Sequence, residues 1–374
     1  MLRGFRYRFY PTPEQDTLLR RTIGCARLVY NKALHERAEA WTNGKKSIGY
    51  AAQSRALTSW KKLPELAFLN EVSSVPLQQG LRHLQSAYTG FFAKHAKYPT
   101  FHRKSRGGSA EFTRSAFRFK SGTLTLAKMS EPLDIHWSRP LPKDVNPSTV
   151  TVGLDPAGRW HVSLLCEDAS IRALPKLKTA VGIDLGITSL VTLSTGEKIA
   201  NPRHDERQQS RKRILSRRLA RKQKGSKNRD KARTKLARLH AHVADRRRDH
   251  LHKLSTRLIR ENQVIVVEDL NVRGMVRNHS LARVISDAGW SEFIRQLDYK
   301  SEWYGRDFVK VDRFFPSSKT CGACGHVVER LSLSVRQWVC PACDAEHDRD
   351  VNAARNILAA GLAVVRKDNV CGPD

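Results

Sequence analysis

The segment AVGIDLGITSLVTLSTGEKIANP, residues 180–202, decides the fold class of the second half of this chain. It joins two short apolar runs through a tight connection, and Gly196-Glu197 then turns the chain into a third run. Such runs, separated by turn residues, predict a three-stranded meander. Further along, residues 263–268 (QVIVVE) form a short apolar run that is typical of a strand buried in a parallel or mixed sheet. The second half is therefore predicted to contain a sheet with buried strands.

A carboxylate lies in each of these apolar stretches. Asp184 stands in the middle of Gly182-Ile183-Asp184-Leu185-Gly186, where a buried charge needs a partner. For a lone strand aspartate, a structural salt bridge is a better explanation than a metal site. Glu268 changes this balance, because it ends its strand at the carboxyl edge, where open α/β sheets place their active sites.

The third carboxylate is Asp350, which lies in the first turn of the last predicted helix. This helix starts at about Asp348. Asp348 lies about 200° around that helix from Asp350, and we interpret it as the N-cap. Asp269, next to Glu268, alternates away from it on the strand. The stripe that starts at Asp350 holds small and apolar residues that let the helix lie close to the sheet: Ala353, Ala354, Ile357 and Leu358.

Three inward-facing acids without a histidine form an all-oxygen ligand set, which suits a hard cation such as Mg2+ or Mn2+. Two such ions can hold the attacking water and the leaving oxygen of a phosphodiester. Asp184, Glu268 and Asp350 are therefore predicted to be the catalytic and metal-binding residues of a site that hydrolyses a nucleic-acid backbone.

Four of the seven cysteines form two Cys-x-x-Cys pairs that are separated by fifteen residues. This spacing is typical of a zinc ribbon, in which four thiolates surround the metal as a tetrahedron. The ribbon is predicted over residues 318–346 and should bind one structural Zn2+ with no open coordination position. Cys25, Cys166 and Cys371 lie scattered, which fits a reducing compartment better than a disulfide framework. The predicted zinc ligands are Cys321, Cys324, Cys340 and Cys343.

The chain has 374 residues, with 67 Lys and Arg against 36 Asp and Glu, and its formal net charge is +31. A folded protein with this charge repels itself unless an anionic partner neutralises it, and nucleic acid is the expected polyanion. A membrane partner is not expected, because the apolar stretch at residues 357–365 is far shorter than the ~20 residues that cross a bilayer. The N-terminus lacks the continuous apolar segment of a signal peptide, so a cytoplasmic protein is expected.

The first half is predicted to fold separately. Residues 3–10 alternate in period two, as in a strand, whereas residues 14–40 and 75–94 carry apolar residues at helical spacing. After about Arg103 the pattern changes to short strands, and together these elements predict a small β-barrel with a helical insertion. The expected strands are residues 116–119, 123–126, 133–137, 149–154 and 160–166, the last two joined by a turn at residues 155–158.

Residues 205–248 are strongly basic, with 18 Lys or Arg against four Asp or Glu. They predict a long helical hairpin that breaks near Gly225-Ser226. Its apolar stripe is too thin to be buried on both sides, which leaves a cationic surface.

Candidate nucleic-acid contacts occur in three places. Gln78, Gln79 and Arg82 carry side chains that can read base edges, although a plain exposed helix face is the favoured explanation. Aromatic and basic side chains alternate around residue 100. They could stack on a single strand of nucleic acid, and a solvated loop is the alternative. The candidates in this second place are Tyr98, Phe101, Arg103 and Lys104, and those in the basic hairpin are Arg211, Arg217 and Arg218.

The chain resembles the TnpB family of insertion-sequence-encoded, RNA-guided nucleases, which are similar to the type V CRISPR effectors. The resemblance rests on motifs that occur in order over nearly the whole chain. They are RFYPTPEQ at residues 8–15, GCAR at 24–27, GIDLG, VVEDL, the two Cys-x-x-Cys pairs and HDRDVNAARNI at 347–357.

This resemblance implies an α+β multidomain chain. Residues 1–10 and 103–175 would form a β-barrel wedge domain, and residues 11–102 a helical recognition lobe. Residues 180–374 would form an RNase H-like, RuvC-type α/β nuclease domain with the basic hairpin and an inserted four-cysteine zinc ribbon. The resemblance makes Asp184, Glu268 and Asp350 the catalytic acids of that domain.

The resemblance also implies the partners: a structured guide RNA from the transposon end, and double-stranded DNA that is cut beside a short adjacent motif. A monomeric ribonucleoprotein is the expected assembly, although the sequence leaves the oligomeric state open. Two other functions remain as alternatives. A nuclease-silent RNA-guided DNA-binding repressor is disfavoured by the intact acids. A DDE-type transposase also uses three acids on an RNase H-like fold, but the zinc ribbon and the DVNAA helix favour the nuclease.

Overall fold

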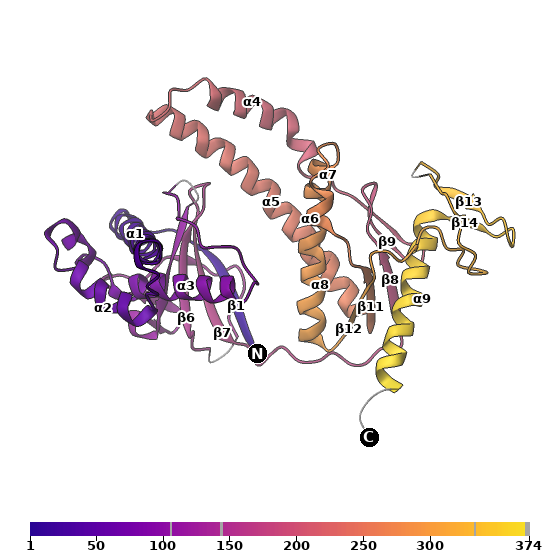
Figure 1. Cartoon of the computed structure of the whole chain (residues 1–374), viewed down its shortest axis with the longest axis horizontal. Helices are drawn as coiled ribbons and strands as arrows, with labels where there is room; N and C mark the ends of the chain where they lie inside the picture. Colours follow the sequence, from indigo (N-terminus) through magenta and orange to yellow (C-terminus); the bar gives the residue numbers. More distant parts are fainter. Residues whose placement is uncertain (105–106, 143–144, 333, 371–374) are drawn as a thin grey trace. The chain divides into compact units, whose positions relative to one another are not determined.

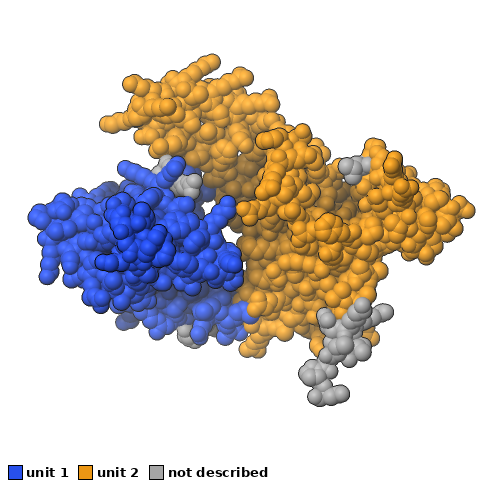
Figure 2. Space-filling view, in the orientation of Figure 1, with its two compact units in different colours: residues 1–170 blue, residues 171–374 orange. Residues whose placement is uncertain are grey.

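Contacts divide the chain between Ser170 and Ile171, a few residues before the predicted end of the wedge domain at residue 175. The computed structural model describes residues 1–104, 107–142, 145–332 and 334–370, and its two units, Met1–Ser170 and Ile171–Asp374, are coloured separately in Figure 2. Cys371 and residues 105–106, which follow the expected change of pattern at about Arg103, lie outside the described residues. The finer division of the first unit into a wedge and a recognition lobe stays a prediction.

The alternating aromatic residues at the N-terminus build the first unit's sheet. Phe5, Tyr7 and Phe9 of β1 (Leu2–Phe9) are buried in its core, while Arg6 between them is exposed. The five strands are antiparallel and lie in the order β2-β6-β7-β1-β5. The other members are β2 (Gly108–Thr113), β5 (Ile135–His136), β6 (Thr149–Leu154) and β7 (Trp160–Glu167).

A separate hairpin, β3 (Phe117–Lys120) and β4 (Thr123–Leu126), packs its apolar residues into the same core. The strand predicted from residue 116 thus starts one residue later, because Arg114–Ala116 form a 3-10 turn, η3. β2 was not predicted. In the described residues the five-stranded ladder ends at β2 and β5 and does not close on itself, so the β-barrel stays a prediction.

Helices of the first unit form a second core. α1 (Pro13–Gly44) begins at Thr12, whose hydroxyl accepts from the Gln15 N–H while the Gln15 side chain accepts from the Thr12 N–H, a capping box. α3 (Ser74–Phe92) matches the second predicted helix. This core is completed by two helices that were not predicted, α2 (Tyr50–Trp60) and the 3-10 helix η1 (Pro64–Asn70).

The second unit is built on the meander at residues 180–202, as predicted. β8 (Ala180–Asp184), β9 (Ser189–Leu193) and β10 (Lys198–Ala200) are antiparallel neighbours. β11 (Val264–Glu268) lies parallel to β8 and to β12 (Asp307–Val311), so the sheet is mixed and its order is β10-β9-β8-β11-β12.

Helices cover both faces of this sheet (Figure 1). α5 (Lys227–Glu261) and α8 (Trp290–Tyr304) pack on one face, where they meet Ile183 of β8 and Val267 of β11. α9 (Arg349–Val370) packs on the other face. A Cβ on Gly182 would lie only 2.1 Å from the Ala354 carbonyl oxygen, so the glycine lets the helix lie directly on β8. The predicted close approach of this helix to the sheet is confirmed.

The basic segment forms the predicted hairpin, shown in Figure 1 as two arms that extend from the second unit's sheet. η4 (Glu206–Gln208) and α4 (Gln209–Ala220) make the first arm, and α5 makes the second. Gly225 has φ +85°, and the Ser226 hydroxyl accepts from the Arg229 N–H to start α5. Two short helices, α6 (Val272–Met275) and α7 (Ala282–Ala288), follow β11. None of the helices in the described part of the chain is long and apolar enough to cross a membrane.

Candidate active site and metal centre

Asp184 and Glu268 end adjacent parallel strands on the same face of the sheet. β8 and β11 pair in register up to Ile183 opposite Val267, which places the next pair of residues, Asp184 and Glu268, side by side. Because side chains alternate along a strand, both carboxylates lie on the face opposite Ile183 and Val267. That is the face that α9 covers.

Asp350 reaches the same place from the first turn of α9. The Asp348 carboxylate accepts from the Val351 N–H at 3.0 Å, which confirms Asp348 as the cap of this helix. Lys198 of β10 holds Asp348 through an ion pair of 2.6 Å. As predicted, Ala353 and Ala354 on the stripe of Asp350 are buried against the sheet.

The three acids line one cleft of about 660 Å3. Lys319, Arg336 and Arg349 contribute cationic groups to the cleft, and Nη1 of Arg336 lies 3.4 Å from Oδ1 of Asp350. Phe314 also lines it and is 85% exposed. A cleft lined by acids, cations and an exposed ring suits a nucleic-acid strand better than a small apolar ligand.

Burial shifts the pKa of two of these acids, Asp184 and Glu268. Burial raises the pKa of Asp184 to about 7, with a further contribution from the charges of Glu268 and Asp350. Burial also raises the pKa of Glu268, while the hydroxyl of Ser317, which donates to its Oε1, opposes that shift. A divalent cation among these oxygens would favour their charged forms. The all-carboxylate donor set therefore fits Mg2+ or Mn2+.

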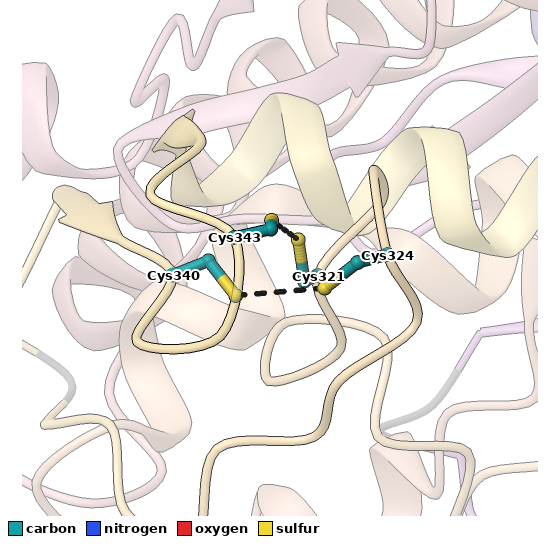
Figure 3. A group of neighbouring side chains, drawn as sticks. All are labelled: Cys321, Cys324, Cys340 and Cys343. Carbon is teal, nitrogen blue, oxygen red and sulfur yellow. Dashed lines mark hydrogen bonds between the residues drawn. The ribbon is translucent and has the colours of Figure 1, made fainter.

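The predicted zinc ligands come together as a compact group (Figure 3). The Sγ atoms of Cys321 and Cys343 lie 3.7 Å apart, as do those of Cys324 and Cys340. Four sulfurs at about 2.3 Å from a central Zn2+ would be separated by about 3.8 Å, so the spacing fits tetrahedral coordination. Among the described residues, these four cysteines are the one set of three or more potential metal ligands whose donor atoms all lie within 4.8 Å of one another. The three carboxylates are less tightly gathered.

A histidine joins the cysteine group. Nε2 of His347 lies 3.0 Å from Sγ of Cys321, and its ring packs against Trp338. His347 belongs to β14 (Glu346–Asp348), which pairs with β13 (Gln337–Val339) and leads directly into α9. His347 was not among the predicted zinc ligands.

Of the predicted nucleic-acid contacts in the first unit, three come together. Gln79, Phe101 and Arg103 line one pocket of about 250 Å3, with Arg27 and His83 beside them. Gln79 is only 7% exposed, so the exposed helix face proposed as its alternative is wrong for this residue, since its neighbour Gly80 packs closely on α1. The remaining candidates Gln78, Arg82, Tyr98 and Lys104 do not line the pocket.

Two of the four remaining candidates form hydrogen bonds with tyrosines, and the other two are exposed. Nε of Arg82 donates to the Tyr50 hydroxyl at 3.3 Å, and the hydroxyl of Tyr98 lies 3.0 Å from that of Tyr88. Gln78 and Lys104 are exposed. In the second unit, Arg211, Arg217 and Arg218 are exposed on α4, which has no fully buried residue.

The fold is that of the Cas12-type proteins. It is similar to Cas12f1 in the cryo-EM structure of the Cas12f1-sgRNA-target DNA complex, with a TM-score of 0.57, 16% sequence identity and coverage of 90% of this chain and 81% of the other. At this identity the similarity establishes the fold alone.

Sequence comparison establishes the family. Residues 163–279 match the family described as "Probable transposase" of the IS605 OrfB type, and residues 290–357 match the "Cas12f1-like, TNB domain". Residues 1–46 match a "Helix-turn-helix domain", although in the structure this segment holds β1 and the long helix α1.

Full-length relatives extend the match to nearly the whole chain. A protein of Streptomyces pristinaespiralis, provisionally named an RNA-guided DNA endonuclease, is 61% identical over 99% of this chain and 91% of its own. A protein of Escherichia coli K12 with the same provisional description is 34% identical over 97% of this chain and 93% of its own. The chain belongs to the TnpB family.

Proposed function

We propose that this protein is an RNA-guided DNA endonuclease of an insertion sequence, which cleaves target DNA by metal-dependent phosphodiester hydrolysis. The observation that carries the proposal is the meeting of Asp184, Glu268 and Asp350 in one cleft that basic side chains also line. The names of the two full-length relatives support the same activity.

Asp184, Glu268 and Asp350 would hold two divalent cations, Mg2+ or Mn2+. Such ions supply an activated water and stabilise charge on the leaving oxygen. Lys319, Arg336 and Arg349 would hold the backbone phosphates of the strand, and the exposed ring of Phe314 would stack on one of its bases. The sheet with α9 would be the RNase H-like, RuvC-type core, and the cysteine group would hold one structural Zn2+.

The proposed partners are a guide RNA from the transposon end and double-stranded target DNA. The formal charge of +31 and the exposed arginines of α4 favour binding to phosphate backbones. The pocket lined by Gln79, Phe101 and Arg103 is the proposed reader of the short motif beside the target. The first unit would form the wedge and recognition lobe around it.

Two other functions are less consistent with the site. A nuclease-silent RNA-guided repressor would not need three acids in one cleft. A DDE-type transposase would use the acids to join strands and would act without a guide RNA. The requirement for RNA therefore separates the endonuclease from the transposase, and cleavage separates it from the repressor.

The proposal is tested by substituting each acid in the protein with its RNA. Asp184→Ala, Glu268→Ala and Asp350→Ala should each lower the cleavage rate by about 1,000-fold, since metal ions supply several kcal/mol of transition-state stabilisation. Binding of matched DNA should stay close to that of the wild type. Asp269→Ala is the matched control, because Asp269 is also a carboxylate at the end of β11 but pairs with Arg313 at 2.6 Å, away from the cleft. An acid whose removal leaves cleavage unchanged is not part of the site.

A further inference from the structure

Asn352 joins the first Cys-x-x-Cys turn to helix α9. It lies two residues after Asp350, and its Oδ1 accepts a hydrogen bond from the Gly322 N–H at 2.9 Å. Its Nδ2 donates to the carbonyl oxygen of Thr320 at 2.7 Å. Gly322 and Thr320 flank Cys321, so a single side chain holds the backbone on both sides of a predicted zinc ligand.

Asn356 extends this connection by one helical turn. Its Nδ2 donates to the carbonyl oxygens of Ser317 at 2.8 Å and of Thr320 at 2.7 Å. The hydroxyl of Ser317 in turn donates to the carboxylate of Glu268. A continuous set of hydrogen bonds therefore runs from the cysteine turn to Glu268 and to the helix that carries Asp350.

These contacts are buried and close. Asn352, Asn356 and Ser317 are 3%, 7% and 6% exposed, so water cannot replace their hydrogen bonds readily. A Cβ on Gly322 would lie 2.8 Å from Oδ1 of Asn352, so a larger residue at this position would push the asparagine side chain away. Gly325, in contrast, has φ +79° and open space around it, as expected of a turn glycine.

We infer that Ser317, Asn352 and Asn356 are positioning residues that couple the geometry of the zinc ribbon to Glu268 and Asp350. The ribbon then sets how well these carboxylates can share a divalent cation, rather than acting only as a separate folding module. The inference rests on the proposed function for the role of the acids, whereas the hydrogen bonds themselves do not depend on it.

The test uses four variants of the full-length protein with its RNA: Asn352→Ala, Asn356→Ala, Gly322→Ala and Ser317→Ala. Cleavage of saturating matched DNA should slow by about 10- to 100-fold, because small displacements of catalytic groups have effects of this size. The Mg2+ concentration for half-maximal cleavage should rise. The zinc content and the affinity for matched DNA should stay at wild-type values, whereas a general loss of structure would lower both.

Ile259→Val is the control for stability. Ile259 is buried in the core on the opposite face of the sheet, so the substitution weakens packing without touching the asparagines. It should leave the cleavage rate unchanged below the unfolding temperature. If either asparagine variant fails to fold or loses zinc, Ser317→Ala and Gly322→Ala decide the question, since both leave the asparagine side chains in place.

A second readout does not require cleavage. Calorimetry measures Mn2+ binding to the wild type, to Asp184→Ala as the reference for loss of the site, and to the four variants. Weaker Mn2+ binding in the variants supports the inference even if the wild type cuts no DNA, in which case only the proposed function fails. Wild-type Mn2+ affinity and wild-type cleavage in all four variants would overturn the inference.

Discussion

At the scale of single residues, Asp184 has the most informative environment. Burial and the neighbouring charges of Glu268 and Asp350 raise its pKa to about 7, well above the 3.8 expected for an exposed aspartate. The folded state therefore holds a proton that the unfolded state releases between about pH 4 and pH 7. Its contribution to stability is present at low pH and is lost as the pH rises through about 7.

Asp184→Asn removes this pH dependence. In buffer without Mg2+ or Mn2+, the variant should be more stable than the wild type at pH 8, by at most about 4 kcal/mol. The difference should shrink towards pH 5, where the wild-type carboxyl is protonated. Thermal unfolding at the two pH values measures this, and Asp269→Asn serves as the control for loss of an acid at the end of the neighbouring strand β11. Equal melting temperatures of variant and wild type at pH 8 would contradict the raised pKa.

The sequence predicted some of these residues and missed others for physical reasons. Asp184 and Glu268 could be found because a charge in an apolar strand is unusual, and strand alternation fixes the face on which it lies. Ser317 could not be found, because its contact with Glu268 depends on the path of an irregular loop. Asn352 and Asn356 do carry a signal, since polar residues at i and i+4 interrupt an otherwise apolar helix face.

At the scale of elements, the ribbon should depend on its metal. The protein should contain one Zn2+ per chain, and Cys321→Ser should lower this content and destabilise the second unit, because structural zinc contributes folding free energy directly. Metal analysis of fresh protein and thermal unfolding measure the two effects. Cys25→Ser is the control, since Cys25 is buried in the helical core of the first unit. Fresh protein without zinc would contradict the assignment.

The basic hairpin should bind RNA through phosphate contacts. Arg211, Arg217 and Arg218 are exposed, and the described residues offer none of them an ion-pair partner. Replacing all three with Ala should weaken RNA binding. It should also reduce the magnitude of the slope of log affinity against log salt concentration by about 2 to 3, since each phosphate contact contributes about 0.7 to 0.9 to that slope. Arg295→Ala is the control, because Arg295 already pairs with Glu292 at 2.8 Å. An unchanged slope would show that α4 does not touch the RNA.

Elements with a strong periodicity were predicted well, and weakly patterned ones were not. The meander, β11 and the long helices α1 and α3 lie within a few residues of their predicted bounds, and α9 begins one residue after its predicted start. β2 was missed because its sequence GSAEFT opens with Gly and Ser and contains a charge, so only pairing with β6 makes it a strand. α2 was missed because it buries just three side chains.

At the scale of the whole molecule, the sequence predicted two parts with different compositions and placed their boundary near residues 175–180. The structure divides at residue 170, and each unit has its own core. What the sequence could not supply is the grouping of Gln79, Phe101 and Arg103, because these residues come together through the packing of α3 against β2 and the loop before it. Contacts of that kind join segments whose local patterns contain no information about each other.

RNA guidance distinguishes the proposed endonuclease from a nuclease or transposase that binds DNA directly. An excess of 31 positive charges requires a polyanion, but charge alone does not distinguish a guide RNA from the DNA substrate. The protein should therefore be isolated as a ribonucleoprotein and be poorly soluble without RNA. RNA extracted from the purified protein and sequenced would identify the guide.

The most direct test measures cleavage of a matched double-stranded target after bound nucleic acid has been removed with nuclease at high salt. Without RNA the protein should leave the target intact, and adding back the cognate RNA should restore cutting, with Asp184→Ala inactive under both conditions. Cutting at the same rate without RNA would contradict RNA guidance and would favour a nuclease or transposase that grips DNA directly.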